Sequence, residues 1–494
     1  MTDRISRPGG RAARRWLLAV TLLAVSLLAP PLGSAPLAAS EPPEERLERL
    51  EREVAALREA LARLAASPAP RAPQSPETLE AATPAAEPAP TAVSGELAEL
   101  SRRVDLLAEE LESLRVGEAA ARADSAERGM GPAASKVYRT REGLSIGGYG
   151  EVVYQRFEER RDDGARSGRT DEADLLRGIV YFGYKWTDRW LLNTEIEFEH
   201  GSTGEGGEVS VEFAYLDYLW RDELGARAGL LLVPMGFLNE LHEPTTFLGA
   251  RRPGVESAII PTTWRELGFG VHGELGPWSY RSYLVNGLDA SGFSASGIRG
   301  GRQKGARAKA EDWAWTGRLD YTAIPGLLAG ASAYVGGSGQ GLRDAAGESV
   351  GDVRTTLLEA HVEWKWRGLE LRALGVHGEV DDVPALNRAL GLTGSRSVGE
   401  RQEGGYVEAG FDLLSLAPAS RQALVPFARL ERYDTQARVP AGFARNPAND
   451  VEVLTLGLAW RPIPQAVLKI DWQDVDNAAG TGIDQLNVAL GYIF

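Results

Sequence analysis

The spacing of hydrophobic residues changes once along the chain, near residue 143. Before that point, Leu and Val recur in steps of three and four residues, which is the a/d spacing of a coiled coil. From Gly143 onward apolar and polar residues alternate, which is the period of a β-strand with two different faces. Residues 190–199 show the alternation most clearly, with apolar residues or Thr at even positions and Asn or Glu at odd positions from 193 on.

Alternating segments of this kind recur throughout residues 143–494. We count sixteen of them, near 143–157, 174–186, 190–199, 208–220, 224–233, 266–274, 277–286, 312–323, 327–336, 353–366, 369–379, 404–414, 421–433, 451–461, 465–474 and 484–494. Short turns and long Gly-rich, charged loops alternate between them, as in outer-membrane barrels. The pattern predicts an all-β transmembrane barrel of about 16 antiparallel strands, preceded by a periplasmic α-helical coiled coil. An even strand number places both barrel ends on the periplasmic side.

The last segment carries the sharpest local signal. Leu486, Val488, Leu490, Tyr492 and Phe494 alternate up to the final residue. Aromatic residues at the membrane interface are typical of transmembrane barrels. Chains of bacterial outer-membrane proteins end in this way, and the terminal Phe resembles their assembly signal.

The first 142 residues divide into five parts. Residues 1–40 combine a basic start, an apolar run and small residues, and so predict a signal peptide; an uncleaved membrane anchor is the alternative. Coiled-coil segments follow at 41–66 and 94–120, separated by a Pro/Ala-rich linker (67–93) and followed by a second linker (121–142). The two seams are Leu47, Leu50, Val54, Leu57, Leu61 and Leu64, and Leu97, Leu100, Val104, Leu107, Leu111 and Leu114. Oligomerisation would bury both seams, whereas packing on the protein's own barrel would bury them within one chain.

Composition narrows the function further. The chain of 494 residues has 54 Lys+Arg against 69 Asp+Glu, a net charge of −15, and no Cys. Nucleic-acid binding requires a basic face, so this balance argues against it. The absence of Cys excludes thiol catalysis, thiolate metal sites and disulfides, and suits export to an oxidising compartment.

The opening Gly147-Gly148-Tyr149-Gly150-Glu151, the strand count and the long connection after the fifth strand resemble bacterial outer-membrane porins. More narrowly, residues 144–494 resemble the phosphate-selective porin O/P family, which also carries a coiled coil before its barrel. The resemblance rests on architecture and not on a diagnostic motif. It implies a homotrimer of sixteen-stranded barrels, each narrowed by its third long loop.

The matching loop is 234–265, which has too many apolar residues for a freely solvated loop. We expect it to fold into the barrel; folding over the barrel mouth is the alternative. Its pore-constriction candidates are Glu240, His242, Glu243, Arg251, Arg252, Glu256 and Arg265. Arg251 and Arg252 are candidates for a local anion constriction, although a salt bridge with loop carboxylates is the simpler expectation.

The alternation also assigns charged residues to the inner wall. The basic candidates are Arg177, Lys185, Arg227, Arg281, Arg318, Lys365, Arg372 and Lys469. The acidic ones are Glu195, Glu197, Glu199, Glu212, Glu266, Asp320, Glu359, Glu363, Glu370, Glu408, Asp412 and Asp471. Phosphate-selective pores are lined by ladders of basic residues. This mixed wall departs from that pattern, so the family resemblance does not establish phosphate specificity.

The sequence contains no recognisable catalytic constellation. No Gly-x-Ser-x-Gly elbow and no His-Glu-x-x-His motif accompanies the five histidines. His361 alternates with Glu359 and Glu363, a pattern that a metal site and an ordinary polar wall share, and the wall is the simpler interpretation. We therefore expect no enzyme activity, metal or cofactor.

These features predict a porin in the outer membrane of a Gram-negative-type bacterium, with the N-terminal region in the periplasm. Small hydrophilic solutes or ions would diffuse through it passively, anions such as phosphate among them. Its partners would be outer-membrane lipid, two further copies of the chain and, through the coiled coil, the cell wall. The alternative is a structural anchor, in which a plugged barrel holds a coiled-coil stalk that tethers the membrane to the cell wall.

Overall fold

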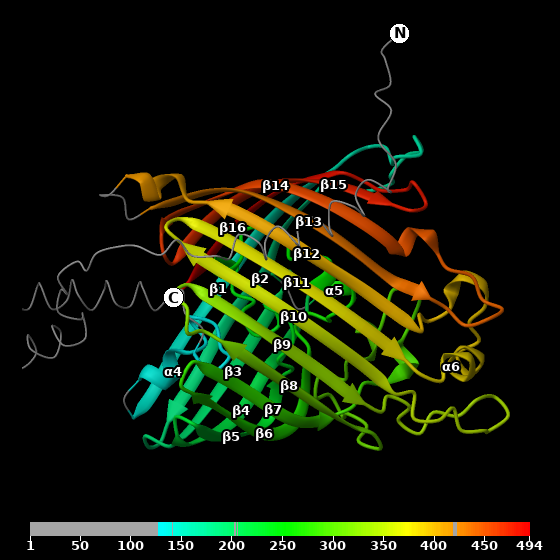
Figure 1. The fold of residues 1–494 in the computed structure, drawn as a ribbon, viewed down its shortest axis with the longest axis horizontal. Helices are drawn as coiled ribbons and strands as arrows, with labels where there is room; N and C mark the ends of the chain where they lie inside the picture. Colours follow the sequence, from blue (N-terminus) through cyan, green and yellow to red (C-terminus); the bar gives the residue numbers. More distant parts are fainter. Residues whose placement is uncertain (1–126, 141, 202–203, 205, 418–421) are drawn as a thin grey trace, which may run out of the picture. The chain divides into compact units, whose positions relative to one another are not determined.

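The structure is a computed structural model that describes residues 127–494, except 141, 202–203, 205 and 418–421 (Figure 1). The predicted signal peptide, both coiled-coil segments and the linker between them lie outside the described residues. Among the helices that the structure describes, none has the length and apolar character needed to cross a bilayer.

Sixteen antiparallel strands form one closed barrel, in which each strand pairs with its sequence neighbours and β1 pairs with β16. The strands are β1 (Gly143–Phe157), β2 (Glu172–Lys185), β3 (Trp190–Glu199), β4 (Val209–Arg221), β5 (Leu224–Leu232), β6 (Arg265–Leu275), β7 (Trp278–Asn286), β8 (Trp313–Tyr321), β9 (Leu327–Gly336), β10 (Thr355–Trp366), β11 (Leu369–Val380), β12 (Arg401–Phe411), β13 (Ala423–Arg438), β14 (Asp450–Ile463), β15 (Ala466–Asn477) and β16 (Gln485–Ile493). The predicted strand number and antiparallel order are confirmed.

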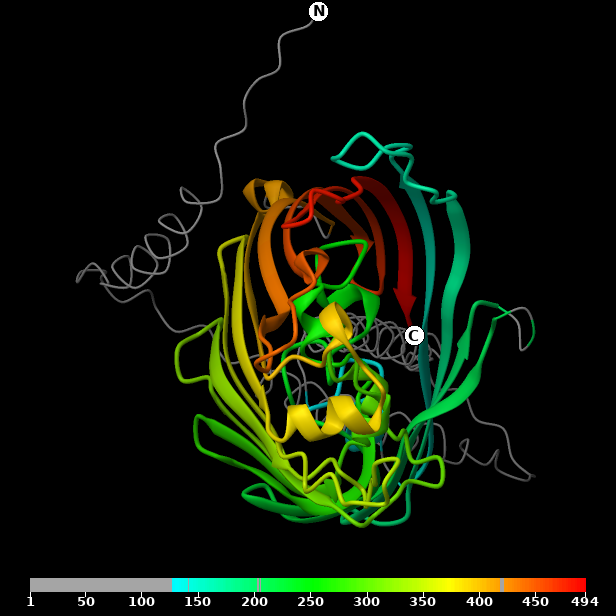
Figure 2. The ribbon, with the colours of Figure 1, turned by 90° about the vertical axis from the view of Figure 1, so that its right-hand side faces the viewer.

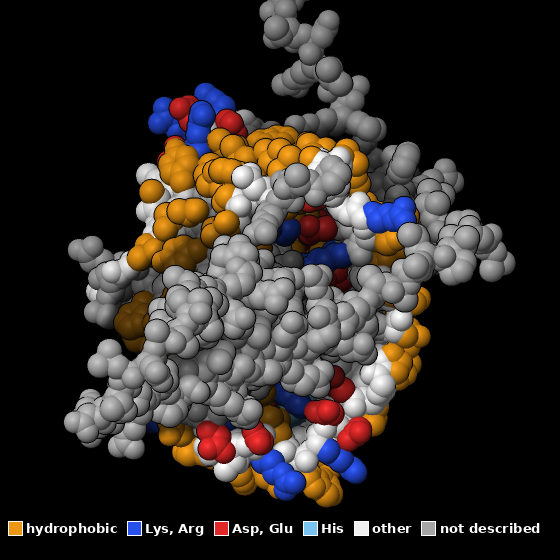
Figure 3. Space-filling view, turned by 90° about the vertical axis from the view of Figure 1, so that its left-hand side faces the viewer, with side chains coloured by type: hydrophobic (Ala, Val, Ile, Leu, Met, Phe, Trp, Pro, Cys, Tyr) orange, Lys and Arg blue, Asp and Glu red, His pale blue; other side chains and the backbone are white. Residues whose placement is uncertain are grey.

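The alternation of side chains separates an apolar outside from a polar inside. Even-numbered residues of β3 such as Trp190 and Phe198 are exposed, whereas Asn193, Glu195 and Glu197 are buried. Figure 3 shows the same division at the short-turn end, with hydrophobic side chains on the outer surface and acidic and basic ones within the ring. An exposed apolar belt around a closed sheet is the arrangement that a bilayer stabilises.

Aromatic pairs mark the short-turn end of this belt. Tyr184 contacts Trp186, Trp190 contacts Tyr218, and Trp278 contacts Tyr321, with ring centroids 4.7–5.5 Å apart. All three pairs lie at strand ends beside short turns. Tyr and Trp rings prefer the membrane–water interface because one edge is apolar and the other polar.

The closing seam explains the glycines that open β1. Tyr492 pairs with Gly150, and Phe494 exchanges backbone hydrogen bonds of 2.9 and 3.1 Å with Gly148. A Cβ at Gly148 would lie 2.6 Å from the Phe494 ring, and one at Gly150 would lie 2.5 Å from the Tyr492 ring. The glycines therefore leave room for the two C-terminal aromatic rings, an arrangement that fixes the register of neighbouring strands.

The long loops carry the remaining short helices. They are η1 (Pro244–Thr246), α5 (Val255–Ala258), η2 (Ala290–Gly292), η3 (Arg299–Gly301), α6 (Val383–Ala389), η4 (Gly394–Arg396) and η6 (Pro447–Asn449). On the short-turn side lie α4 (Lys136–Arg139), before β1, and η5 (Leu413–Leu416). Asp412, which we expected on the inner wall, lies in this turn, where its side chain accepts a hydrogen bond from Leu414 N. The expected position is wrong because β12 ends one residue earlier, at Phe411.

Two segments lie inside the ring of strands. One is the inner loop, residues 233–264 between β5 and β6, which Figure 2 shows in green within the ring. The other is the inner segment, residues 127–140 before β1, which falls within the linker (121–142) that the sequence predicts. Met130 and Val137 of the segment and Phe237 and Ile259 of the loop belong to one buried cluster with wall residues such as Tyr215 and Leu374. The core of this protein therefore lies inside the barrel.

Candidate constriction inside the barrel

The inner loop keeps its shape through two buried polar side chains. Asn239 donates to Val233 O at 2.6 Å and to Trp264 O at 2.9 Å, and accepts from Trp264 N at 2.6 Å. This holds the two ends of the loop together. Glu256 accepts from Leu238 N at 2.7 Å and from Tyr406 OH at 2.7 Å. Since both residues are fully buried, their hydrogen bonds satisfy polar groups that water cannot reach.

Charged residues of the wall bind the backbone of this loop. Lys469 donates to Gly249 O at 3.0 Å, and Asp471 accepts from Ala250 N at 2.6 Å. Arg372 donates to Thr246 O at 2.9 Å, Glu431 accepts from Gly254 N at 2.9 Å, and Arg318 donates to Gly236 O. Four of the predicted lining residues, Arg318, Arg372, Lys469 and Asp471, therefore hold the loop. A simple count of wall charges does not describe the surface that a solute would meet.

Other predicted residues form buried ion pairs within a strand, between strands, and between a strand and the inner loop. Arg281 lies 2.6 Å from Asp320 and 3.1 Å from Glu240 of the loop, and Arg318 lies 2.8 Å from Asp320. His361 contacts Asp320 through Nε2 and Glu359 through Nδ1, both at 2.8 Å. Glu363 pairs with Arg372 and not with His361, so the three residues considered as a metal site do not come together. The described contacts of His361 are those of a polar wall.

The remaining predicted residues line the same interior. Arg177 lies 3.5 Å from Glu151, Arg429 3.2 Å from Glu408, Arg461 3.0 Å from Glu370 and Lys365 3.4 Å from Glu363. Arg265, the first residue of β6, lies 2.9 Å from Glu212. Glu266 accepts from Asn286 at 2.8 Å, and Lys185 donates to Tyr138 O at 3.4 Å. Glu199 ends β3.

The inner segment is bound by a hydrogen-bond network that the sequence pattern does not predict. The Tyr138 hydroxyl lies 2.9 Å from Asp217, 2.9 Å from Tyr215 and 2.8 Å from Arg227. His272 lies 2.7 Å from the same Asp217. The odd-numbered positions of β4 contained the signal for Tyr215 and Asp217, but nothing in the local pattern indicated that residue 138 would reach them.

Glu243 connects the inner loop to the inner segment. Its carboxylate accepts from Ala133 N and Ala134 N, both at 3.0 Å. Burial raises the pKa of Glu243 to about 7, although these two donors act in the opposite direction. A buried carboxylate that accepts backbone N–H groups from another segment couples the positions of the two segments.

Four arginines in the inner loop and in the loop folded against it make no ion pair within the described part of the chain. Arg251 and Arg252 belong to the inner loop, and Arg299 and Arg302 to the loop between β7 and β8. Arg299 and Arg302 donate to Thr262, and Arg252 donates to His242 O at 3.1 Å. Burial and the neighbouring Arg252 lower the pKa of Arg299. The expected salt bridges of Arg251 and Arg252 with loop carboxylates are absent among the described residues.

Arg299 and Arg302 are not among the pore residues predicted from the sequence, although a signal was present. Residues 299–309 contain five basic residues and no acidic one, in a chain of net charge −15. Such a run in a long loop is usually solvated. Only the folding of this loop against Thr262 brings it beside the inner loop.

Comparison with known proteins adds one clear relationship. No family model matches the chain. A protein of Aquifex aeolicus described as uncharacterized is 36% identical over 377 residues, which cover 74% of this chain and 83% of that protein. The chain belongs to the same family as this Aquifex protein. The relative's description names no activity.

Solved outer-membrane proteins resemble the barrel at low identity. DcaP, an outer-membrane channel of Acinetobacter baumannii, is 15% identical with a TM-score of 0.44, over 71% of this chain and 97% of its own. OmpF of Salmonella typhi is 11% identical with a TM-score of 0.45, over the same shares. OmpT of Vibrio cholerae, solved in a trimer form, is 11% identical with a TM-score of 0.42, over 72% of this chain and 100% of its own. Likenesses at these scores are too weak to indicate a function.

Proposed function

We propose that this protein is an outer-membrane porin that conducts small hydrophilic solutes by passive diffusion and prefers anions. The observation that carries the proposal is a group of four arginines without ion pairs among the described residues: Arg251 and Arg252 of the inner loop, and Arg299 and Arg302 of the β7–β8 loop that folds against it. An arginine whose charge is not neutralised by a carboxylate attracts anions, and low-dielectric walls strengthen that attraction. Phosphate is one candidate, as the porin O/P resemblance implies.

The location follows from the outer face of the barrel. Its exposed apolar belt and the aromatic pairs beside the short turns fit a bilayer, and we place the short turns and residues 41–142 in the periplasm. The two a/d seams at 47–64 and 97–114 support a homotrimer. Because the interior residues are used to hold the inner loop and segment, we propose no catalytic activity.

The test is single-channel recording of the purified protein in a planar bilayer under a salt gradient. We expect a reversal potential of the sign that shows anion preference. The double variant Arg251→Gln/Arg252→Gln should move the reversal potential toward cation preference. The control Arg166→Gln/Arg396→Gln removes the same charge from exposed outer loops and should leave it almost unchanged.

A second function has its own support, since the inner loop and the inner segment both occupy the barrel. In this proposal the barrel is plugged and anchors a coiled-coil stalk that tethers the membrane to the cell wall. Folded protein that migrates as a heat-modifiable band but gives no conductance would reject the porin and favour the anchor. Deleting residues 41–120 should leave a conducting barrel if the stalk is an accessory of the porin.

A further inference from the structure

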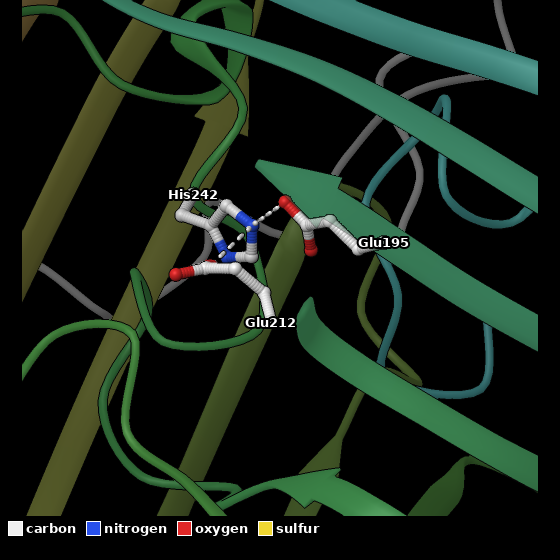
Figure 4. Close-up of side chains that lie close together, drawn as sticks. All are labelled: Glu195, Glu212 and His242. Carbon is white, nitrogen blue, oxygen red and sulfur yellow. Dashed lines mark hydrogen bonds and ion pairs between the residues drawn. The ribbon is translucent and has the colours of Figure 1, made fainter. Parts of the chain in front are cut away.

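Three side chains from separate parts of the chain meet in the interior with their polar atoms facing one another (Figure 4). Nε2 of His242, in the inner loop, lies 3.2 Å from Oε1 of Glu195 on β3 and 3.8 Å from Oε2 of Glu212 on β4. The Glu195 and Glu212 side chains have no solvent exposure, and that of His242 is 2% exposed. Two carboxylates and one imidazole are thus held together away from water.

A bulge in the barrel wall creates this grouping. The β3–β4 register shifts between Glu195 and Ile196, so that Glu195 pairs with Phe213 and Ile196 with Val211. Glu212 is the extra residue, and both it and Phe213 are fully buried on the inner face. Regular alternation would have sent one of the two to the lipid. Bulges commonly redirect a side chain beside a functional site.

The orientation of His242 is fixed from the other side of its ring. Nδ1 lies 3.0 Å from the backbone oxygen of Asn239, the residue that joins the two ends of the inner loop. Nδ1 must therefore carry a hydrogen, which leaves the Nε2 lone pair of the neutral ring directed at the two carboxylates. A histidine held through Nδ1 by a carbonyl is the usual arrangement of a metal-ligating imidazole.

The carboxylates have unused acceptor atoms. Oε2 of Glu195 and Oε2 of Glu212 accept no hydrogen bond from any described residue, and neither does Oε1 of Glu197, two residues along the same face of β3. Arg265 occupies only Oε1 of Glu212, at 2.9 Å. Leaving a buried charged acceptor unpaired costs free energy, so these oxygens and the Nε2 lone pair require a shared cation.

We propose that Glu195, Glu212 and His242 bind one divalent metal ion of the kind that accepts nitrogen as well as oxygen ligands, with Zn²⁺ as the representative. Ligand atoms around tetrahedral Zn²⁺ lie about 3.3 Å apart. The 3.2 and 3.8 Å separations in this site are close to that spacing, and the three ligand atoms all lie within 4.8 Å of one another. Three protein ligands leave a fourth position for water or Glu197.

The surrounding charges are compatible with such an ion. Glu195, Glu197 and Glu212 supply three negative charges, against which Arg265 and Arg252 supply two positive ones. Arg177 is paired with Glu151. A proton on His242 is the competing cation, so a metal ion would displace it, as metal binding to imidazole normally does.

His361 provides the contrast that the test uses. It also contacts two carboxylates, but through different ring nitrogens, so Asp320 and Glu359 lie on opposite sides of the ring. Glu359 has no unused oxygen, because Oε2 accepts from Ser332 at 2.5 Å. Glu359 resembles Glu195 because it is buried and contacts a histidine. Unlike Glu195, it does not share one ring nitrogen of that histidine with a second carboxylate.

The experiment measures Zn²⁺ on the untagged mature chain, folded in detergent and first treated with a chelator. Equilibrium dialysis against Zn²⁺, followed by elemental analysis, should give one bound ion per chain. Co²⁺ in its place should give the visible absorption of a four-coordinate site. The Glu195→Gln and His242→Gln variants should bind at least about tenfold more weakly and lose that absorption. Glu359→Gln should bind like the unmodified chain.

Heat-modifiable migration on gels verifies that each variant is folded. The proposal is overturned if the folded unmodified chain binds no more Zn²⁺ than the Glu195→Gln variant does, because a proton on His242 then takes the place of the metal ion. It is also overturned if Mg²⁺ or Ca²⁺ competes equally with Zn²⁺, since those ions prefer oxygen ligands. Metal binding and conductance are separate readouts. Failure to bind Zn²⁺ would leave the proposed channel function untouched, and failure to conduct would leave the proposed metal site untouched.

Discussion

The inner loop and the inner segment both fill the barrel, but they are held there in different ways. The loop joins β5 to β6, and its backbone is bound by side chains from β8, β11, β13 and β15. The segment precedes β1, and its side-chain hydrogen bonds centre on the Tyr138 hydroxyl and the Glu243 carboxylate. Single bonds from Asn193, Arg227 and Lys185 to backbone oxygens of the segment lie beside them. Because the contacts of the loop are spread over four strands, we expect the loop to stay in the barrel when one of them is lost. Because the contacts of the segment are concentrated on two side chains, we expect a single substitution to release it.

The largest effect should come from breaking the loop at Glu256. Replacing Glu256 by Ala leaves the Leu238 N–H and the Tyr406 hydroxyl buried without partners. We expect a loss of about 4 kcal/mol in the docking of the loop, and a larger single-channel conductance as the loop leaves the interior. Glu256→Gln keeps one acceptor oxygen for Leu238 N–H, and its NH2 group can donate to the Tyr406 hydroxyl oxygen, so it should conduct nearly as the unmodified protein does. Equal conductance in both variants would show that the loop does not narrow the pore.

A smaller, pH-dependent effect should come from Glu243, which connects the two segments. Its folded pKa of about 7 lies above the unfolded value of about 4.3, so the docked state holds the proton more tightly. The stabilisation is therefore fully present below about pH 4.3 and declines as the pH rises to 7, by at most about 3 kcal/mol. The melting temperature of the unmodified protein should fall as the pH rises over this range.

The Glu243→Gln variant tests the cause of that pH dependence. Glutamine stays neutral and can still accept from Ala133 N and Ala134 N. The part of the pH dependence due to Glu243 should vanish, and above pH 7 the variant should be the more stable protein. An unchanged pH profile would assign the dependence to other buried groups.

The smallest effect should come from Tyr138→Phe. Removing the hydroxyl takes a partner from Asp217, Tyr215 and Arg227, but Asp217 keeps Arg227 and His272. We expect about 2 kcal/mol less binding of the inner segment. Limited proteolysis should then cut within residues 127–140 faster while the strands stay intact. Tyr154→Phe, whose hydroxyl is exposed, is the control and should be cut at the unmodified rate. Equal rates for both variants would mean that the Tyr138 network does not hold the segment.

The strand pattern was predictable because it depends on local alternation. Residues 190–199 alternate in the sequence and in the structure, with Glu195 and Glu197 inside as expected. The prediction for Asp412 is wrong because β12 ends one residue earlier, at Phe411. Glu212 is buried inside as expected, but only through the bulge between β3 and β4, which local periodicity does not encode.

The interior contacts were less predictable, because they join positions far apart in the chain. The charges of Lys469 and Asp471 indicated a polar wall, but not that they bind the backbone of residues 249 and 250. In the same way, residues 127–140 have the composition of a linker with a few apolar side chains. Their place in the core depends on Tyr138 meeting Asp217, 79 residues away.

The sequence by itself determined the closed sixteen-stranded barrel, its apolar outer face and its polar inner one, because strand periodicity and turn length are local properties. It also selected the loop after the fifth strand as the unusual one. Only the tertiary structure decided which charges are neutralised by partners, which hold backbone, and which remain unpaired. The reason is physical: pairing inside a barrel depends on the distance between side chains that the chain separates by tens to hundreds of residues, and no local pattern records that distance.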